Sequence, residues 1–215
     1  MRFSTRALAL SAVLAGTFAA SANAQLATTG GVSPSAPAAA PAPAPQAVVP
    51  GAVEIPAGMR TVEGIKAKRY KGKTQDGRTA FFAQIPTGAP AEVQQAIIAA
   101  NKIVGLPYKY GGGHARVQDT GYDCSGTVSY ALIGAKLLDS PLPSYDFEKS
   151  WKQGEPGAGT WISVYGNKGH AFAVIAGLRL DTSAARDSSG LKGPQWRPDN
   201  RRDHKSFTVV HPAGF

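Results

Sequence analysis

Residues 121–126, with the sequence Gly-Tyr-Asp-Cys-Ser-Gly, constrain this chain more than any other segment, because they hold its only cysteine. A glycine-rich stretch, residues 108–113, comes shortly before them. After them, apolar residues recur at the spacing that predicts a helix buried along one face. Asp123 stands where a helix N-cap is expected, so Cys124 is expected in the first helical turn. The apolar positions are Val128, Ala131, Leu132, Ala135 and Leu138.

The start of a helix is a favourable place for a reactive thiol. Unpaired backbone N–H groups and the positive end of the helix dipole favour an anion there, and the thiolate is the nucleophilic form of cysteine. The alternative is that Cys124 is a small apolar side chain packed in the core, as free cysteines often are. The motif around Cys124 favours the catalytic interpretation.

The N-terminus has the features of a secretory signal peptide. Arg2 and Arg6 form a positive region, and residues 7–20 are apolar but too few to span a bilayer as a helix. The small-x-small sequence at 22–24 predicts cleavage before Gln25. We therefore expect a periplasmic or secreted mature chain without an integral membrane segment; an N-terminal membrane anchor is the alternative.

Export, the single cysteine and the positive net charge limit which kinds of molecule are expected as partners. Secreted chains usually pair their cysteines in disulfides, and a single cysteine cannot form an internal bridge. The formal net charge is +9, and loss of Arg2 and Arg6 with the signal peptide leaves +7. Such a chain is expected to associate with polyanions of the cell envelope. Nucleic acid is not expected as a partner, because the basic residues are scattered and not interleaved with aromatic residues.

Composition divides the chain into four parts. The signal peptide, 1–24, is followed by an Ala- and Pro-rich segment, 25–56, that predicts an extended, semi-rigid, disordered linker. Residues 57–88 show short strand patterns separated by glycine turns. They are too few for an independent core, so we expect a β-rich appendage, packed on the main domain or covering its cleft. The main domain is expected at 89–215.

The main domain is expected to be α+β. A strong helical pattern at 91–104 begins after Pro90, which suits the first helical position, and ends before Gly105. A polar, loop-like region is expected at 184–205. Helices that precede an antiparallel sheet are typical of an α+β fold with one core. The expected strands are 160–165, 169–176, 178–183 and 206–210.

A cysteine nucleophile needs a base and a group that orients the base. Of the four histidines, His170 lies in an expected strand, His114 in the glycine-rich loop, and His204 and His211 in polar segments. If a two-residue turn at 176–177 joins the strands, His170 and Asp181 share a sheet face and lie close enough for contact. A three-residue turn would place them on opposite faces. The alternatives are a structural core histidine and a solvated carboxylate.

These motifs together resemble a known family. Tyr-Lys-Tyr-Gly-Gly at 108–112, Asp-Cys-Ser-Gly at 123–126 and a later Gly-His in a strand are similar to the NlpC-type family of cell-wall cysteine peptidases. The resemblance covers residues 92–210 and implies a circularly permuted papain-like fold, with N-terminal helices packed on an antiparallel sheet.

The resemblance also implies roles for individual residues. Cys124 corresponds to the nucleophile and His170 to the base, and the third catalytic position, often a second histidine in the family, falls on Asp181. The expected substrate-binding residues are Tyr110, Asp123, Ser125 and Gly169. The chain departs from the family by lacking a Gly-Asp-Leu segment before the histidine strand, which leaves its substrate preference open.

The implied reaction is hydrolysis of an amide in the stem peptide of peptidoglycan, most often the bond between D-glutamate and a diamino acid. Neither a metal nor another cofactor is required, and the sequence has no Cys/His cluster for a structural zinc site. Two alternatives are a hydrolase or acyltransferase of the same fold that acts on another wall or lipid bond, and a non-catalytic wall-binding protein. Whether an inhibitor regulates the activity stays open.

Overall fold

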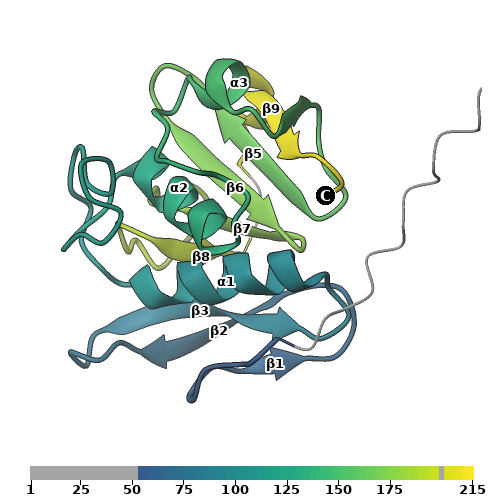
Figure 1. The fold of residues 1–215 in the computed structure, drawn as a ribbon. Helices are drawn as coiled ribbons and strands as arrows, with labels where there is room; N and C mark the ends of the chain where they lie inside the picture. Colours follow the sequence, from purple (N-terminus) through teal and green to yellow (C-terminus); the bar gives the residue numbers. More distant parts are fainter. Residues whose placement is uncertain (1–52, 199–200) are drawn as a thin grey trace, which may run out of the picture. The chain divides into compact units, whose positions relative to one another are not determined.

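The computed structural model describes residues 53–198 and 201–215, and these form an α+β fold (Figure 1). The expected signal peptide and most of the expected linker lie outside the described residues. In the described part of the chain, no helix combines the length and the apolar character needed to cross a membrane.

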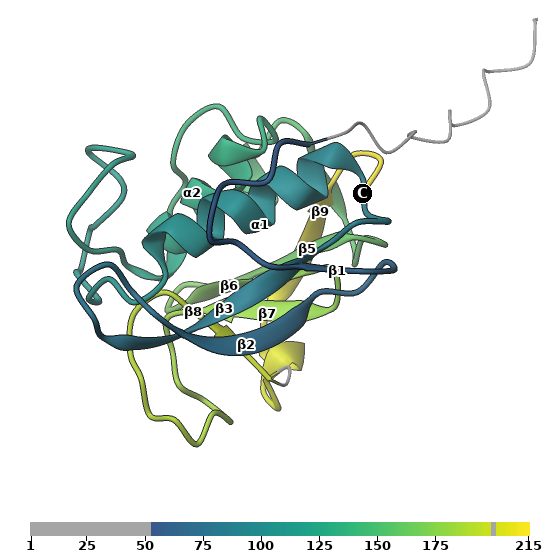
Figure 2. The same cartoon turned by 90° about the horizontal axis from the view of Figure 1, so that it is seen from below.

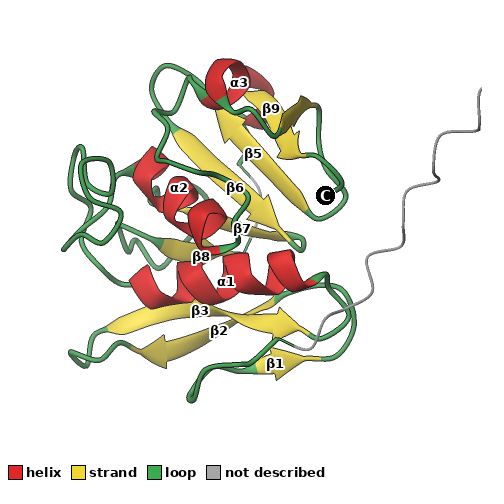
Figure 3. Cartoon of the chain, viewed as in Figure 1, coloured by secondary structure: helices red, strands yellow, loops and turns green. Residues whose placement is uncertain are grey.

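Six antiparallel strands form the main sheet, and α1 and α2 pack against it (Figures 1 and 3). Helix α1 spans Ala91–Ile103, α2 spans Cys124–Gly134 and the short α3 spans Phe147–Ser150. The strands, in their spatial order, are β4 (Gly154–Pro156), β9 (Thr208–Pro212), β5 (Ile162–Gly166), β6 (Ala171–Ile175), β7 (Leu178–Asp181) and β8 (Gln195–Arg197).

Three further strands form a second sheet, which packs against α1 and lies beside β8 of the main sheet (Figure 2). They are β1 (Thr61–Val62), β2 (Lys68–Lys73) and β3 (Thr79–Pro86), with β3 in the centre and β1 parallel to it. Ala83 and Ile85 of β3 are fully buried in the same hydrophobic core as Ile97 of α1. The β-rich segment therefore shares the core of the main sheet and helices.

Helix α2 differs from its expected amphipathic pattern. It begins at Cys124 as predicted, but all of residues 124–132 are buried. The reason is that α2 packs on α1, β6 and β7, while the glycine-rich loop approaches its N-terminus. The expected single buried face is therefore wrong. Pro90 is the N-cap of α1 and precedes the first helical residue, one position earlier than expected.

The region 184–205 is not entirely the polar loop that the sequence predicts. It contains β8 and the start of a 3₁₀ helix at His204–Ser206. Only Trp196 is apolar in β8, so the strand has no sequence pattern to reveal it, yet all three of its residues are buried. Strand β4 was not expected either, because its segment Gly154–Pro156 carries glycine and proline. The strands β5, β6, β7 and β9 lie where they were expected, with ends shifted by about two residues, as is usual for strand boundaries.

Asn101 connects three elements in the core. Its Oδ1 accepts hydrogen bonds from the backbone N–H of Ala83 in β3 (3.1 Å) and from Nε1 of Trp196 in β8 (2.8 Å). Its Nδ2 donates to the carbonyl of Ala83 (2.8 Å). The amide therefore pairs with the backbone of β3 as a neighbouring strand would, and it also satisfies the buried indole.

We expect Asn101→Ala to lower the free energy of unfolding by roughly 3 kcal/mol or more, since it leaves three buried polar groups unpaired at about 1–3 kcal/mol each. Urea denaturation measures the change. Lys102→Ala, at the exposed next position of α1, is the control and should change stability by less than about 0.5 kcal/mol. Equal stability of the two variants would contradict this role for Asn101.

Candidate active site

Cys124 is the first residue of α2, and the glycine-rich loop packs directly against this helix start. The N–H of Asp123 donates to the carbonyl of Gly112 (3.2 Å), and the N–H of Lys109 donates to the carbonyl of Tyr122 (3.2 Å). A Cβ on Gly126 would collide with the carbonyl oxygen of Gly112. Glycine at position 126 therefore permits the close approach of the loop that surrounds the thiol.

The Asp123 carboxylate holds this arrangement together. Its Oδ1 accepts the N–H of Gly126 (2.7 Å), which caps α2 as predicted, and the hydroxyl of Ser125 (3.1 Å). Its Oδ2 accepts the N–H of Gly111 from the glycine-rich loop (3.1 Å). Burial of Asp123 favours its neutral form, but the hydrogen bonds from His114 and Gly126 lower its pKa below the ordinary value. The ionised Asp123 side chain thus links the glycine-rich loop to α2 through hydrogen bonds.

His114 also bonds to the Asp123 carboxylate. Its Nε2 lies 3.1 Å from Oδ1 of Asp123 and 3.1 Å from the hydroxyl of Ser125. The hydrogen bond to Asp123 raises the pKa of His114 and outweighs the opposite effect of burial. His114 therefore stabilises the charged form of Asp123, the N-cap residue of α2.

The turn between β6 and β7 decides where His170 and Asp181 lie. Ile175 pairs with Leu178, so the turn has two residues, and both of them, Ala176 and Gly177, have positive φ (49° and 81°). This is the geometry of a tight hairpin turn that matches the strand twist. Of the two turn lengths that the sequence left open, the structure has the two-residue one. His170, which was expected inside the strand, lies immediately before β6.

His170 and Asp181 are in contact, as the register predicted. Nε2 of His170 lies 2.8 Å from Oδ1 of Asp181, whose side chain is fully buried. The same Oδ1 accepts the N–H of Ser183 (2.8 Å). Asn167 fixes the backbone at His170, because its Oδ1 accepts the backbone N–H groups of both Gly169 and His170 (2.9 Å each).

The thiol of Cys124 completes the group. Burial of the His170 ring favours its neutral form, but hydrogen bonds with Asp181 and with Cys124 raise its pKa to about 9. Because Nε2 is occupied by Asp181, Nδ1 is the nitrogen that remains for the thiol. Cys124, His170 and Asp181 are therefore brought together, with His170 in the middle.

The expected substrate-binding residues differ in how far their side chains are exposed to solvent. The Tyr110 side chain is 91% exposed. Asp123 and Ser125 are buried, and their side chains bond to each other and to His114. The N–H of Gly169 is bonded to Asn167. Of these residues, Tyr110 in the glycine-rich loop exposes its side chain to solvent. Asp123 and Ser125 form hydrogen bonds at the N-terminus of α2 instead.

Tyr108 is a residue of the site that the sequence reasoning missed. Partial burial raises its pKa first, and the charges of Cys124 and Asp123 raise it further, so its phenol lies near the thiol. The residue is 48% exposed. It belongs to the same Tyr-Lys-Tyr segment as Tyr110, and the parallel bridge between Tyr108 and Tyr122 is the feature that aligns it with the helix start.

Two arginines beside Asp181 were also missed. Arg179 Nε and Arg201 Nη1 each lie 3.5 Å from Oδ2 of Asp181. Arg179 sits two residues before Asp181 on β7, so strand alternation could have placed both on one face. Arg201 follows β8 in a segment without periodicity, and no sequence pattern points to it.

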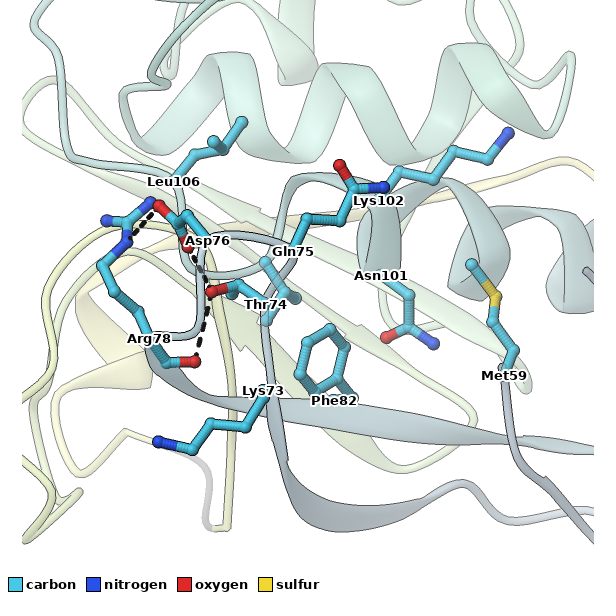
Figure 4. Close-up of a pocket in the computed structure, with 11 residues that line it drawn as sticks. Met59, Lys73, Thr74, Gln75, Asp76, Arg78, Phe82, Asn101, Lys102 and Leu106 are labelled. Carbon is cyan, nitrogen blue, oxygen red and sulfur yellow. Dashed lines mark hydrogen bonds and ion pairs between the residues drawn. The ribbon is translucent and has the colours of Figure 1, made fainter. Parts of the chain in front are cut away.

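A cavity of about 430 Å³ lies elsewhere, where the β2–β3 turn meets the end of α1 (Figure 4). Figure 4 shows Arg78 paired to Asp76 (2.7 Å) at one side of the lining, and Asn101 of α1 with Met59 at the other side. Its lining does not include Cys124 or His170. Within the described residues, no group of three or more His, Cys, Asp or Glu side chains is arranged to hold a metal ion.

Comparison of the chain with protein-family models, with curated proteins and with solved structures finds no match.

The raised pKa of His170 makes stability depend on pH. Since the folded-state pKa of about 9 exceeds the ordinary value, the stabilising contribution is fully present below about pH 6.5 and disappears as the pH rises through 9. We expect the free energy of unfolding to fall over this range by an amount on the order of 3 kcal/mol. In Asp181→Asn the fall should be smaller, because the anion is gone.

Urea denaturation between pH 6 and pH 9.5 measures the slope, and NMR titration of the histidine rings measures the His170 pKa directly. Lys168→Ala, exposed and two residues from His170, is the control and should keep the wild-type slope. An identical slope in wild type and Asp181→Asn would show that the contact with Asp181 does not control the His170 proton.

Proposed function

We propose that this protein is a cysteine peptidase that cleaves an amide bond in the stem peptides of peptidoglycan, with the papain-like fold of the NlpC-type family. The observation that carries the proposal is the placement of Cys124 at the first residue of α2, beside a His170 that is hydrogen-bonded to buried Asp181. A nucleophile, a base and an orienting group are the minimum that such a reaction needs.

His170 is suited to take and return a proton. With a pKa raised to about 9 by its partners Asp181 and Cys124, against the effect of burial, it holds a proton at neutral pH. In the proposed reaction it takes this proton from Cys124, and the thiolate attacks the substrate carbonyl. The imidazolium then gives the proton to the leaving amine as the C–N bond breaks.

The oxyanion of the tetrahedral intermediate needs N–H donors at the helix start. Asp123 already accepts the N–H groups of Gly126 and Thr127, through its side chain and its carbonyl. The N–H groups of Cys124 and Ser125 have no acceptor among the residues that the structure describes. We assign these two orphan donors to the oxyanion, in line with the general chemistry of helix N-termini.

Hydrolysis of the acyl-enzyme repeats the proton transfer in the opposite direction. After the amine leaves, neutral His170 takes a proton from water, and the hydroxide attacks the thioester carbonyl. The C–S bond breaks and Cys124 is restored. Asp181 keeps its hydrogen bond to Nε2 throughout, which leaves Nδ1 directed to the reacting atoms.

Peptidoglycan is proposed as the substrate on the resemblance of the glycine-rich loop, the Asp-Cys-Ser-Gly motif and the Gly-His pair to the NlpC-type family. The exposed rings of Tyr108 and Tyr110 beside the helix start support a site that is open to an extended peptide. The formal charge of +9 favours association with a polyanionic wall.

Digestion of purified peptidoglycan tests the proposal. We expect the wild-type protein to release soluble peptide fragments, whose masses identify the bond that is cut. Cys124→Ala and His170→Ala should each lower the rate by at least about 10³-fold, because the nucleophile or the base is lost. Lys168→Ala should keep wild-type activity. Release of the same fragments at the same rate by Cys124→Ala would refute the proposal.

A further inference from the structure

The two oxygens of the Asp181 carboxylate have different surroundings. Oδ1 accepts hydrogen bonds from Nε2 of His170 and from the N–H of Ser183, both at 2.8 Å. Oδ2 is buried without a hydrogen bond of normal length. Instead it faces the guanidinium groups of Arg179 and Arg201, each at 3.5 Å. A carboxylate that is fully buried is thus balanced on one side by imidazole and on the other by two permanent cations.

The two arginines are held in different ways. Arg179 lies on the same strand as Asp181, is almost fully buried and donates to the carbonyl of Ala185. Arg201 comes from the segment after β8. Its Nε and Nη2 donate to the two oxygens of Asp203, at 2.9 and 2.7 Å. Such a two-point ion pair fixes the plane of the guanidinium.

Arg201 is also fixed by aromatic rings that reach His170. Its guanidinium carbon lies 5.8 Å from the ring centre of Phe172 and 5.5 Å from that of Phe207. The Phe207 ring in turn meets the His170 ring edge to face, with centres 6.2 Å apart. The contacts of Arg201 therefore extend to both members of the His170–Asp181 pair.

We propose that Arg201 is a positioning residue, which orients Asp181 through Oδ2 and supplies a positive charge that limits how tightly the His170–Asp181 pair holds its protons. The proposal rests on the proposed function in so far as Cys124, His170 and Asp181 are the reacting groups. It adds to that function a fourth residue, one that contacts neither the substrate nor the thiol.

The physical reason is the cost of burying charge. A buried carboxylate without a cation tends to take up a proton, and a protonated Asp181 would lose the negative charge that stabilises an imidazolium. A catalytic imidazolium that binds its proton too tightly cannot give it to a leaving amine. A fixed cation beside Oδ2 of Asp181 keeps the carboxylate ionised, and it also lowers the affinity of His170 for its proton.

The charges around the pair define the expected pH effect. His170 faces Asp181 of β7 and Cys124 of α2, and Asp203 acts on it at longer range. Asp181 faces Arg179 from its own strand and Arg201 from the segment after β8, and the buried Arg197 of β8 donates to its backbone carbonyl (3.1 Å). Among these three cations, Arg201 is the one that substitution can neutralise without changing a residue of a buried strand.

The test is the pH profile of Cys124 alkylation by iodoacetamide, which does not depend on any wall substrate. In Arg201→Gln we expect the rate at pH 7 to fall about tenfold and the whole profile to move upward by about one pH unit, since loss of a cation makes the coupled pair hold its protons more tightly. Arg201→Lys keeps the charge, so its profile should stay at the wild-type pH.

Arg202→Gln is the matched control, because Arg202 is the exposed next residue and its profile should equal that of wild type. A purely structural role for Arg201 would weaken the Asp181 contact and move the His170 titration down, toward its ordinary value, which would overturn the proposal. An unshifted Arg201→Gln profile would also overturn it. If Arg201→Gln does not fold, a profile displaced in Arg201→Lys does the same.

The outcome is separable from that of the proposed function. A shifted alkylation profile together with inactivity on peptidoglycan would support the role of Arg201 and reject the substrate. Digestion of peptidoglycan with an unshifted profile would support the function and reject the role of Arg201.

Discussion

The Asp123 carboxylate is the interaction on which the rest of the site depends. One oxygen caps α2 at Gly126 and the other binds the N–H of Gly111 in the glycine-rich loop. Because helix and loop share one anion, the position of Cys124 at the helix start and that of Tyr108 beside it are fixed together. His114 adds a charge-assisted hydrogen bond to the same carboxylate, so a single buried residue organises the part of the candidate site around Cys124.

The part of the candidate site around His170 and Asp181 depends on a turn of two residues. A hairpin register is specified only where the turn length fixes which residues are opposite, and the positive φ angles of Ala176 and Gly177 give the tight form. The register continues to place Phe172 opposite Asp181. One residue more in this turn would have moved Asp181 to the face that carries Leu180 and the helices. The contact of His170 with Asp181 thus depends on the backbone geometry of a turn about six residues after His170.

Features governed by local physics could be predicted from the sequence, and features governed by distant contacts could not. The start of α2 at Cys124 and the β6–β7 turn follow from neighbouring residues, and both were found. Strand β8 is held by its pairing with β7 and by the hydrogen bond of Trp196 to Asn101, which is 95 residues away, and no local pattern encodes these contacts. Arg201 was missed for the same reason. Tyr108 was not singled out, because the spacing of the two tyrosines alone does not show that the charges of Cys124 and Asp123 act on its phenol.

Arg201 and Arg179 also explain why an aspartate is suited to the third position of this site. The resembling family often has a second histidine there, but at position 181 an imidazole would face two guanidinium groups at short range. In a buried site, like charges without a counterion are strongly unfavourable. An anion at this position instead neutralises part of the positive charge and accepts the hydrogen bond from His170. The negative charge of Asp181 and the positive charges of the two arginines therefore compensate one another in the buried site.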